Sequence, residues 1–459
     1  MWPLDQVGAA DARMESEGQM IPHWKHQLEA ITFCQAHPAA YLAMGMRTGK
    51  SRIVVDLCVN EGWRNTLILC PKSGIPVWGE MFHKFGTKYV DVLNLGKGTA
   101  SARRDMAESQ WGAKHPMAAV INYEGFIQPD FRAWALRQKW DAVVVDEAHH
   151  LKAPSGVASR QAAKLRAPRR LMLSGTPLTQ DHLVDAYSQY RFLDPSIFGT
   201  SVARHRARYA VMNPWTPFPK IEGYRNQEEF QQKLGSIMFK VERSVLDLPP
   251  ATHTTVPVEL GPAAAKMYLE MERHLVAQVQ GGVVTAANAL VRLLRLSQIT
   301  GGWIRPDGGL PERVDEAKLG ALVDILEEAD GPVVVYGRFT SDIADIHLAA
   351  DRAGLSCSEI SGSENRLIDW KAGKTEVLAV QIHAGAEAID LTRANHAVYY
   401  SKGYSLSDYE QSLARTHGPD QKRPVSYTHL VAAGTVDEVI EKALAERKDV
   451  VRAVMEGLK

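Results

Sequence analysis

The sequence lacks several features that would assign a protein class at once. Its 459 residues include only four cysteines, Cys34, Cys58, Cys70 and Cys357, and their wide spacing argues against a disulfide framework or a zinc site. Because most of them lie in apolar patterns, we expect buried free thiols. No apolar run approaches the roughly 20 residues that a membrane span requires, and the N-terminus shows no secretory signal pattern. We therefore expect a cytoplasmic protein with no membrane contact.

Net charge is also absent. The chain has 53 basic and 53 acidic residues, so charge alone names no partner. The sixteen histidines show no spacing typical of metal ligands. Positive charge is nevertheless concentrated in two clusters: Arg160, Lys164, Arg166, Arg169 and Arg170, and then Arg204, Arg206 and Arg208. Each cluster could contact a phosphate backbone, with Arg169 and Arg170 as our nucleic-acid-binding candidates, or form a solvated helix face.

The segment YLAMGMRTGKS, residues 41–51, has the working end of a phosphate-binding loop. An apolar run precedes it and a helical pattern follows, so bound phosphates would lie at a helix N-terminus. Gly49 permits the turn, Lys50 can neutralise terminal phosphates, and the hydroxyl of Ser51 can bind Mg²⁺. Met44 stands where the usual pattern has its first glycine, so the match alone is modest. The predicted nucleotide-binding residues of this loop are Gly45, Thr48, Gly49, Lys50 and Ser51.

The acidic pair Asp146 and Glu147 follows a short apolar run, residues 142–145. Such a run is typical of a buried parallel strand, which delivers carboxylates to the C-terminal edge of a sheet, where ligands bind. Asp146 would hold Mg²⁺, and Glu147 would orient and deprotonate the attacking water. The alternative is a pair of solvated acids that cap the next helix. The Gly-Lys-Ser upstream favours the functional interpretation.

Apolar runs alternate with helical patterns in both halves of the chain. NTLILC, MAAVINY, DAVVVDE and RRLMLSG mark a first α/β lobe, and PVVVYG, EVLAVQI, HAVYY and SYTHLVA mark a second. This rhythm predicts parallel sheets flanked by helices, and the prolines in LDLPPATHTT predict an extended linker. We expect an N-terminal segment at 1–20, a first lobe at 21–245, a linker at 246–256 and a second lobe at 257–459.

With its further motifs, the chain resembles the Swi-Snf-like, DEAH-box ATPases of helicase superfamily 2, of a compact bacterial or phage type. The resemblance covers nearly the whole length and rests on HWKHQLEA, LILCPKSGIPVWGEMFHKF, VINYEGF, VVVDEAHH, LMLSGTPLTQ, YRFLDPSIFGT and YEQSLARTHGPDQ. It implies an α/β fold of two RecA-like lobes with helical insertions and a C-terminal brace helix. It also places the protein in a bacterial or phage-infected cell.

The resemblance implies roles for individual residues. Those on the nucleotide are Gln27, at the adenine, and Gly385, Asp390, Gln411 and Arg415, on the second lobe. Those on nucleic acid are Pro71, Lys72, Tyr123 and Thr392. Those that couple the two sites are His149, Ser174, Gly175 and Thr176. The implied catalytic set is Lys50, Asp146, Glu147 and Arg415.

One position departs from the family pattern. Gly418 stands three residues after Arg415, where the family carries a second arginine. An arginine finger can contribute about 10³ to 10⁵ in rate, so its loss would slow hydrolysis unless another group compensates. Arg415 could assume the role, Lys422 or Arg423 could reach in from a shifted loop, or a partner could supply the charge.

The resemblance implies a monomeric motor that uses ATP and Mg²⁺ to move along DNA, duplex in preference to single strands. A protein partner remains open. The competing hypothesis is an ATP-gated clamp that binds DNA, hydrolyses slowly and recruits partners, and Gly418 is its main support.

Overall fold

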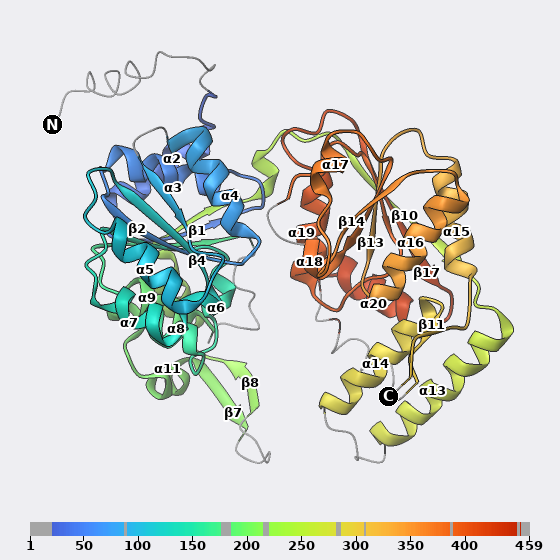
Figure 1. The fold of residues 1–459 in the computed structure, drawn as a ribbon. Helices are drawn as coiled ribbons and strands as arrows, with labels where there is room; N and C mark the ends of the chain where they lie inside the picture. Colours follow the sequence, from blue (N-terminus) through green and yellow to red (C-terminus); the bar gives the residue numbers. More distant parts are fainter. Residues whose placement is uncertain are drawn as a thin grey trace.

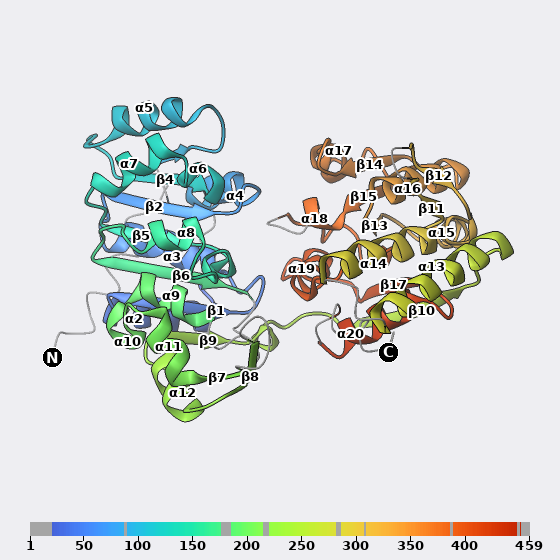
Figure 2. The ribbon, with the colours of Figure 1, turned by 90° about the horizontal axis from the view of Figure 1, so that it is seen from below.

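The computed structural model describes residues 21–450, except 87–89, 176–184, 214–219, 281–285, 307–308, 386–388 and 448–449. The chain forms two α/β lobes that lie side by side, each built on a parallel sheet with helices on both faces (Figures 1 and 2). In the described part of the chain, no helix is long and apolar enough to cross a bilayer. The four cysteines are free thiols, and Cys34, Cys58 and Cys70 are buried, as the sequence predicted.

The first sheet has seven strands in the order β3-β4-β2-β5-β6-β1-β9, and all its pairings are parallel. The strands are β1 Ala39–Met44, β2 Asn65–Cys70, β3 Asp91–Asn94, β4 Met117–Asn122, β5 Ala142–Val145, β6 Arg169–Ser174 and β9 Met238–Val241. The longer helices around it are α2 Lys25–Ala36, α3 Lys50–Asn60, α4 Gly74–Met81, α5 Ala100–Gln110, α7 Pro129–Arg137, α8 Val157–Ala162, α9 Ala186–Leu193, α11 Val202–Tyr209 and α12 Gln227–Gly235.

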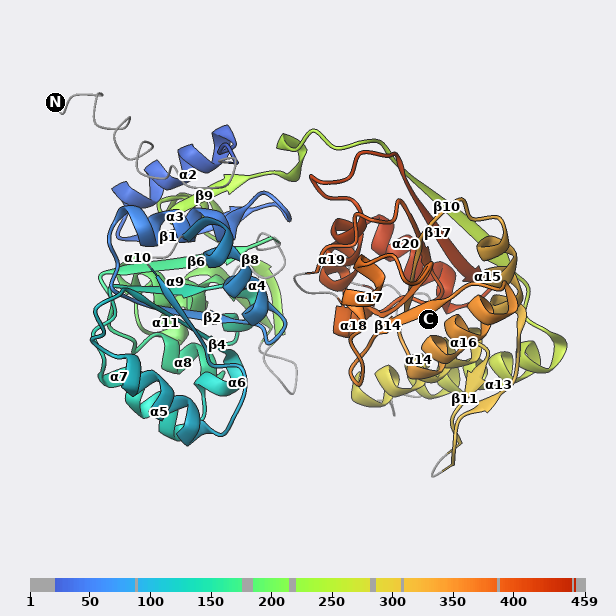
Figure 3. The ribbon, with the colours of Figure 1, turned by 45° about the horizontal axis from the view of Figure 1, so that its top comes forward.

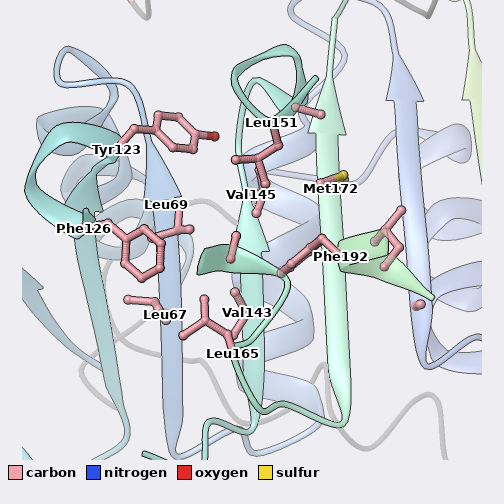
Figure 4. Close-up of a cluster of buried hydrophobic side chains, with 14 of the residues drawn as sticks. Leu67, Leu69, Tyr123, Phe126, Val143, Val145, Leu151, Leu165, Met172 and Phe192 are labelled. Carbon is pink, nitrogen blue, oxygen red and sulfur yellow. The ribbon is translucent and has the colours of Figure 1, made fainter. Parts of the chain in front are cut away.

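Both faces of this sheet are covered, which explains why its strands read as continuous apolar runs. Along β2, Leu67 and Leu69 pack into one cluster, whereas Ile68 and Cys70 pack into the cluster on the opposite face. Figure 4 shows the first of these clusters, where Phe126 lies over β2 beside Leu67 and Leu69.

The second sheet has six parallel strands in the order β10-β17-β16-β13-β15-β14. They are β10 Ala251–Val258, β13 Val333–Gly337, β14 Cys357–Ile360, β15 Val377–Gln381, β16 His396–Tyr399 and β17 Val425–Ala432. The helices are α13 Pro262–Gln280, α14 Ala286–Thr300, α15 Ala317–Glu327, α16 Thr340–Arg352, α17 Leu367–Lys371, α18 Ile382–Gly385, α19 Leu406–Thr416 and α20 Val436–Ala445.

The α/β fold with two parallel-sheet lobes is confirmed, and the structure adds elements that the sequence pattern did not reveal. Residues 251–256, expected within the linker, belong to β10, which pairs with β17 along its whole length. The hairpin of β7 Ala210–Asn213 and β8 Lys220–Tyr224 projects from the first lobe (Figure 1). The short connection before β10 runs between the lobes (Figure 3).

The expected C-terminal brace is helix α20. The Asp437 carboxylate accepts hydrogen bonds from Lys318 Nζ at 2.5 Å and from Thr300 Oγ1 at 2.9 Å. The Tyr268 hydroxyl accepts the Val436 N–H at 2.7 Å. These bonds hold the start of α20 against α13, α14 and α15, whereas residues 451–459 lie outside the described residues.

Candidate nucleotide-binding site

The phosphate loop connects the end of β1 to the start of α3. Gly49 caps α3 in a left-handed conformation with φ +84°, which glycine adopts without steric cost. A Cβ at this position would lie 2.0 Å from Gln27 Nε2, so no larger residue fits. The backbone N–H groups at the start of α3 are therefore presented to an anion at the helix N-terminus. Ser51 follows in the first turn of the same helix.

Lys50 lies at the centre of this loop and is buried. Its Nζ donates to the carbonyls of Met44, at 2.9 Å, and Gly45, at 3.1 Å. Burial lowers the pKa of Lys50, the charges of Glu147 and Asp146 oppose this change, and the Arg415 charge reinforces it. The carbonyls that hold this buried ammonium are neutral acceptors. A phosphate oxygen is charged, so its hydrogen bond to the Lys50 ammonium would be stronger than the present ones.

Gln27 connects helix α2 to the phosphate loop. Only 2% of its surface is exposed, and its Oε1 accepts the Trp24 N–H at 2.9 Å. Its Nε2 faces the Thr48 carbonyl at 3.5 Å, and Thr48 Oγ1 donates to the Gly45 carbonyl at 2.7 Å. The structure therefore places Gln27 directly against the loop, and the predicted adenine contact stays a prediction.

The acidic pair lies at the carboxyl end of β5. Asp146 accepts hydrogen bonds from Trp78 Nε1 at 3.1 Å and from the Glu147 N–H at 3.0 Å. Glu147 has a left-handed backbone with φ +51°, and its carboxylate lies 3.4 Å from His149 Nδ1. Strain of this kind in a non-glycine residue persists where surrounding contacts fix it, and such residues cluster at functional sites.

The two carboxyl groups have opposite pKa shifts. Burial and then the negative charge of Glu147 raise the pKa of Asp146 to about 7, against the lowering effect of Lys50. Burial also acts to raise the pKa of Glu147, but His149, Lys50 and Arg415 together bring it below its ordinary value. Adjacent carboxyls whose pKa values are pushed apart are suited to different roles in one reaction. Glu147 is the one that stays ionised.

Tyr123, directly after β4 and two strands away from β5, supports this strand end. Its hydroxyl donates to the Asp146 carbonyl, and its ring stacks on His150 with centroids 4.6 Å apart. Figure 4 shows the hydroxyl directed toward the end of β5. The side chain is buried and braces the acidic motif, and the predicted contact with nucleic acid stays a prediction. At the same sheet edge, Pro71 is buried and Lys72 is exposed after β2.

Two predicted coupling residues reach the phosphate loop. Ser174 is the buried last residue of β6, and Gly175 follows it. A Cβ at Gly175 would lie 2.9 Å from Met46 Cγ and 3.7 Å from Lys50 Nζ. This segment therefore contacts the loop directly, and Thr176 lies outside the described residues.

The second lobe approaches this site through α19 and through the segment before β16. The positive charge of Arg415 influences both Lys50 and Glu147 across the lobes, and Gln411 lies buried on the same helix. Asp390 accepts hydrogen bonds from the Thr392 N–H at 2.9 Å and its hydroxyl at 2.8 Å. Burial acts to raise the pKa of Asp390, but Arg47 and then Thr392 bring it below its ordinary value. Gly385 ends α18, next to residues 386–388, which are not described.

Arg169 and Arg170 are not brought to this site. They lie at the opposite end of β6, where Arg169 bonds to Glu61 at 3.1 Å and to carbonyls at the end of α2. Arg170 donates to the Phe192 carbonyl at 2.6 Å and the Leu165 carbonyl at 2.9 Å. Both guanidinium groups are engaged in internal bonds, and their predicted nucleic-acid contact stays a prediction.

Sequence reasoning missed two arginines that cross between the lobes. Arg47, in the phosphate loop, donates to the Ile389 carbonyl at 2.6 Å, and Arg243 donates to the His417 carbonyl. Arg47 was visible inside the loop motif, but its direction depends on the relative placement of the lobes. The Arg243 position carried no motif signal.

Comparison with known proteins agrees with this arrangement. Residues 14–301 match the SNF2-related domain, and residues 317–418 match the helicase conserved C-terminal domain. The chain is 22% identical over 458 residues to an ATP-dependent helicase of Mycoplasma genitalium, covering 94% of this chain and 42% of that protein. It is 23% identical to protein p41 of Acyrthosiphon pisum secondary endosymbiont phage 1, covering 90% of this chain and 94% of that protein.

Among solved structures, the Sulfolobus solfataricus SWI2/SNF2 ATPase core in complex with double-stranded DNA is 20% identical. That similarity covers 96% of this chain and 95% of the other, with a TM-score of 0.45. The SNF2-related match spans well over half of the sequence and includes the phosphate loop and the acidic pair. The chain therefore belongs to the SNF2-related family.

Proposed function

We propose that this chain is a DNA-dependent ATPase that couples ATP hydrolysis to movement along DNA, duplex in preference to single strands. One observation carries the proposal. Arg415 of the second lobe lies close enough to Lys50 and Glu147 of the first for its charge to act to lower the pKa of both, although it is far from both in sequence. A phosphate cradle, a carboxylate base and an arginine that come from two lobes are the parts that phosphoryl transfer requires.

The residues of the first lobe fit a nucleoside triphosphate. The start of α3 and Lys50 would hold the phosphates, and Gln27 would support the loop next to the base. Glu147 remains ionised and would orient the attacking water and accept its proton. Arg415 would stabilise the charge that develops on the transferred group. These assignments, and those of Gly385, Asp390, Gln411 and Thr392, remain proposals.

The oxygen atoms at this site also fit Mg²⁺. Ser51 and Asp146 would hold it, and it would neutralise phosphate charge when bound. The shared use of two protein oxygens suits a cation that keeps several waters and binds phosphates. Burial raises the pKa of the Asp146 carboxyl, and a bound cation would lower it by favouring the charged form.

Movement would follow from the division into two lobes. A triphosphate held by the first lobe and contacted by Arg415 stabilises the closed arrangement, and hydrolysis removes that bridge. DNA that contacts both lobes would then be displaced relative to one of them. Lys72, which is exposed at the site's sheet edge, is the first-lobe candidate for a phosphate contact. The chain spans 42% of the Mycoplasma genitalium helicase, so what that whole protein does enters only as support.

Steady-state ATP turnover tests the proposal when it is measured with duplex, single-stranded and forked DNA and with RNA. We expect strong stimulation by duplex DNA. The absence of stimulation by every nucleic acid would refute the motor. ATP-dependent retention of DNA without stimulated turnover would instead support the clamp, which Gly418 favours because it removes a positive charge from the second lobe.

A further inference from the structure

Arg47 has a backbone that its residue type rarely adopts. Its φ is +65°, and in the described part of the chain only Glu147, Asn226 and Arg447 share this left-handed conformation among non-glycine residues. Such strain persists only where the surroundings fix it, and it points to a function that should be sought in the side chain's contacts. Arg47 and Glu147 flank the same site.

The Arg47 side chain leaves its own lobe and reaches the second. Its guanidinium donates to the Ile389 carbonyl at 2.6 Å and lies 3.9 Å from the Asp390 carboxylate. Its Nε is buried and finds no hydrogen-bond partner among the described residues. The guanidinium is thus half-buried at the interface between lobes, and its buried Nε keeps an unused donor.

Gly418 lies at the same place. A Cβ added to Gly418 would come within 3.8 Å of Arg47 Nε and 3.4 Å of Thr392 Cγ2. Arg243 approaches the same turn from the first lobe, because its guanidinium donates to the His417 carbonyl. An arginine at position 418 would therefore enter a space that already faces two guanidinium groups, at a cost in charge repulsion.

We propose that Arg47 is a positioning residue that ties the phosphate loop to the second lobe and holds at the interface the positive charge that Gly418 does not carry. Arg47 lies three residues before Lys50, so a phosphate bound by the loop would fix both the loop and this contact. Nucleotide binding in one lobe would thereby set the position of Asp390 and Arg415 in the other. The inference rests on the proposed function, and it adds a residue from the first lobe to the machinery.

Moving the arginine from position 47 to position 418 tests the proposed role of Arg47. We would prepare Arg47→Gly, which removes the guanidinium and the backbone strain together, Gly418→Arg, and the double variant. Arg225→Ala is the matched control, because Arg225 is exposed and donates to the Ala207 carbonyl within the first lobe. The readouts are hydrogen exchange of the 389–392 segment, with and without a non-hydrolysable ATP analogue, and kcat and KM for ATP with duplex DNA.

For Arg47→Gly we expect faster exchange at 389–392 and a kcat lowered about tenfold, as for the loss of one charged hydrogen bond. KM should change by less than about twofold, because the residue acts through the other lobe. The double variant should regain both analogue-dependent protection and turnover, whereas Gly418→Arg alone should lose turnover through repulsion with Arg47. The control should behave as the parent protein.

Unchanged exchange at 389–392 in Arg47→Gly would overturn the tie between lobes. A double variant with no more protection and no more turnover than Arg47→Gly would overturn the charge replacement. If the parent protein hydrolyses no ATP, the proposed function fails, but exchange with the bound analogue still decides whether Arg47 holds the second lobe.

Discussion

Positive charge has different surroundings at the two ends of the strands of the first sheet, here called the amino-terminal edge and the carboxyl edge. At the amino-terminal edge, Arg169 donates to carbonyls at the end of α2, and Arg170 donates to the Phe192 carbonyl near the end of α9. A helix C-terminus is the negative end of its dipole, so these cations are already satisfied. At the carboxyl edge, Lys50 is the first residue of α3, which is the positive end of a dipole, and Arg47 precedes the helix in the phosphate loop.

This difference shows where a further anion would be favoured. A cation at a helix C-terminus is stabilised by the dipole, whereas a cation at a helix N-terminus is repelled by it, so an anion bound there would relieve the repulsion. The polarity of the parallel strands decides the outcome, because it sends residues after β1 and β5 to one edge and the first residues of β6 to the other. A basic cluster in the sequence does not carry that information.

The largest effect should come from breaking the carboxyl edge. Lys50→Ala removes the charge that holds phosphates, and Glu147→Gln removes the base, so each should lower DNA-stimulated ATP turnover by about 10² to 10⁴-fold. Both variants should still unfold cooperatively on heating, because neither residue packs in a core cluster. Turnover assays and thermal unfolding check this, and retained turnover in either variant would contradict the assignment.

A change at the amino-terminal edge should lower stability and leave ATP turnover intact. Arg170→Ala leaves the carbonyls of Leu165 and Phe192 without their donor. We expect a loss of about 2 kcal/mol in the free energy of unfolding, while ATP turnover and the salt dependence of DNA binding stay unchanged.

Arg166→Ala is the control for this change, because Arg166 is exposed in the same segment. Denaturant unfolding and DNA titration at several salt concentrations measure the two effects. A stable Arg170→Ala variant with weakened DNA binding would restore the nucleic-acid interpretation of this cluster.

The comparison also explains how far the sequence could predict the molecule. The buried strands were recognisable because both faces of each sheet are covered, and their uninterrupted apolar runs, such as Ala142–Val145, have no other simple explanation. Gly49, Lys50 and Asp146 were recognisable because their roles depend on local strand-to-helix geometry. Strand β10 was missed because its first half is exposed and the two prolines before it resemble a linker.

Other features depend on contacts that no local pattern contains. The role of Tyr123 depends on β4 lying two strands from β5, and the direction of Arg47 depends on how the second lobe is placed. The sequence also identified Gly418 as a departure from the family pattern. It could not show that the residue beside this glycine comes from the phosphate loop.

The smallest effect concerns stability, and it separates the two neighbouring acids at the carboxyl edge. Burial raises the pKa of Asp146 to about 7, so its ionisation opposes folding. Its unfolded pKa is about 3.9, and the folded state therefore loses stability as the pH rises from about 4 to about 7. Asp146→Asn should abolish turnover but raise the free energy of unfolding at pH 8, with little gain at pH 4.

Glu147→Gln provides the opposite sign. The pKa of Glu147 lies below its ordinary value, so its charge contributes stability above its unfolded pKa, and that contribution disappears as the pH falls through the folded pKa. This variant should therefore be less stable than the parent at pH 8. Thermal unfolding of both variants at pH 4 and pH 8, without nucleotide or metal, measures the contrast. Equal shifts of the same sign would mean that the two carboxyls share one environment, and the division of roles between metal binding and water activation would lose its physical basis.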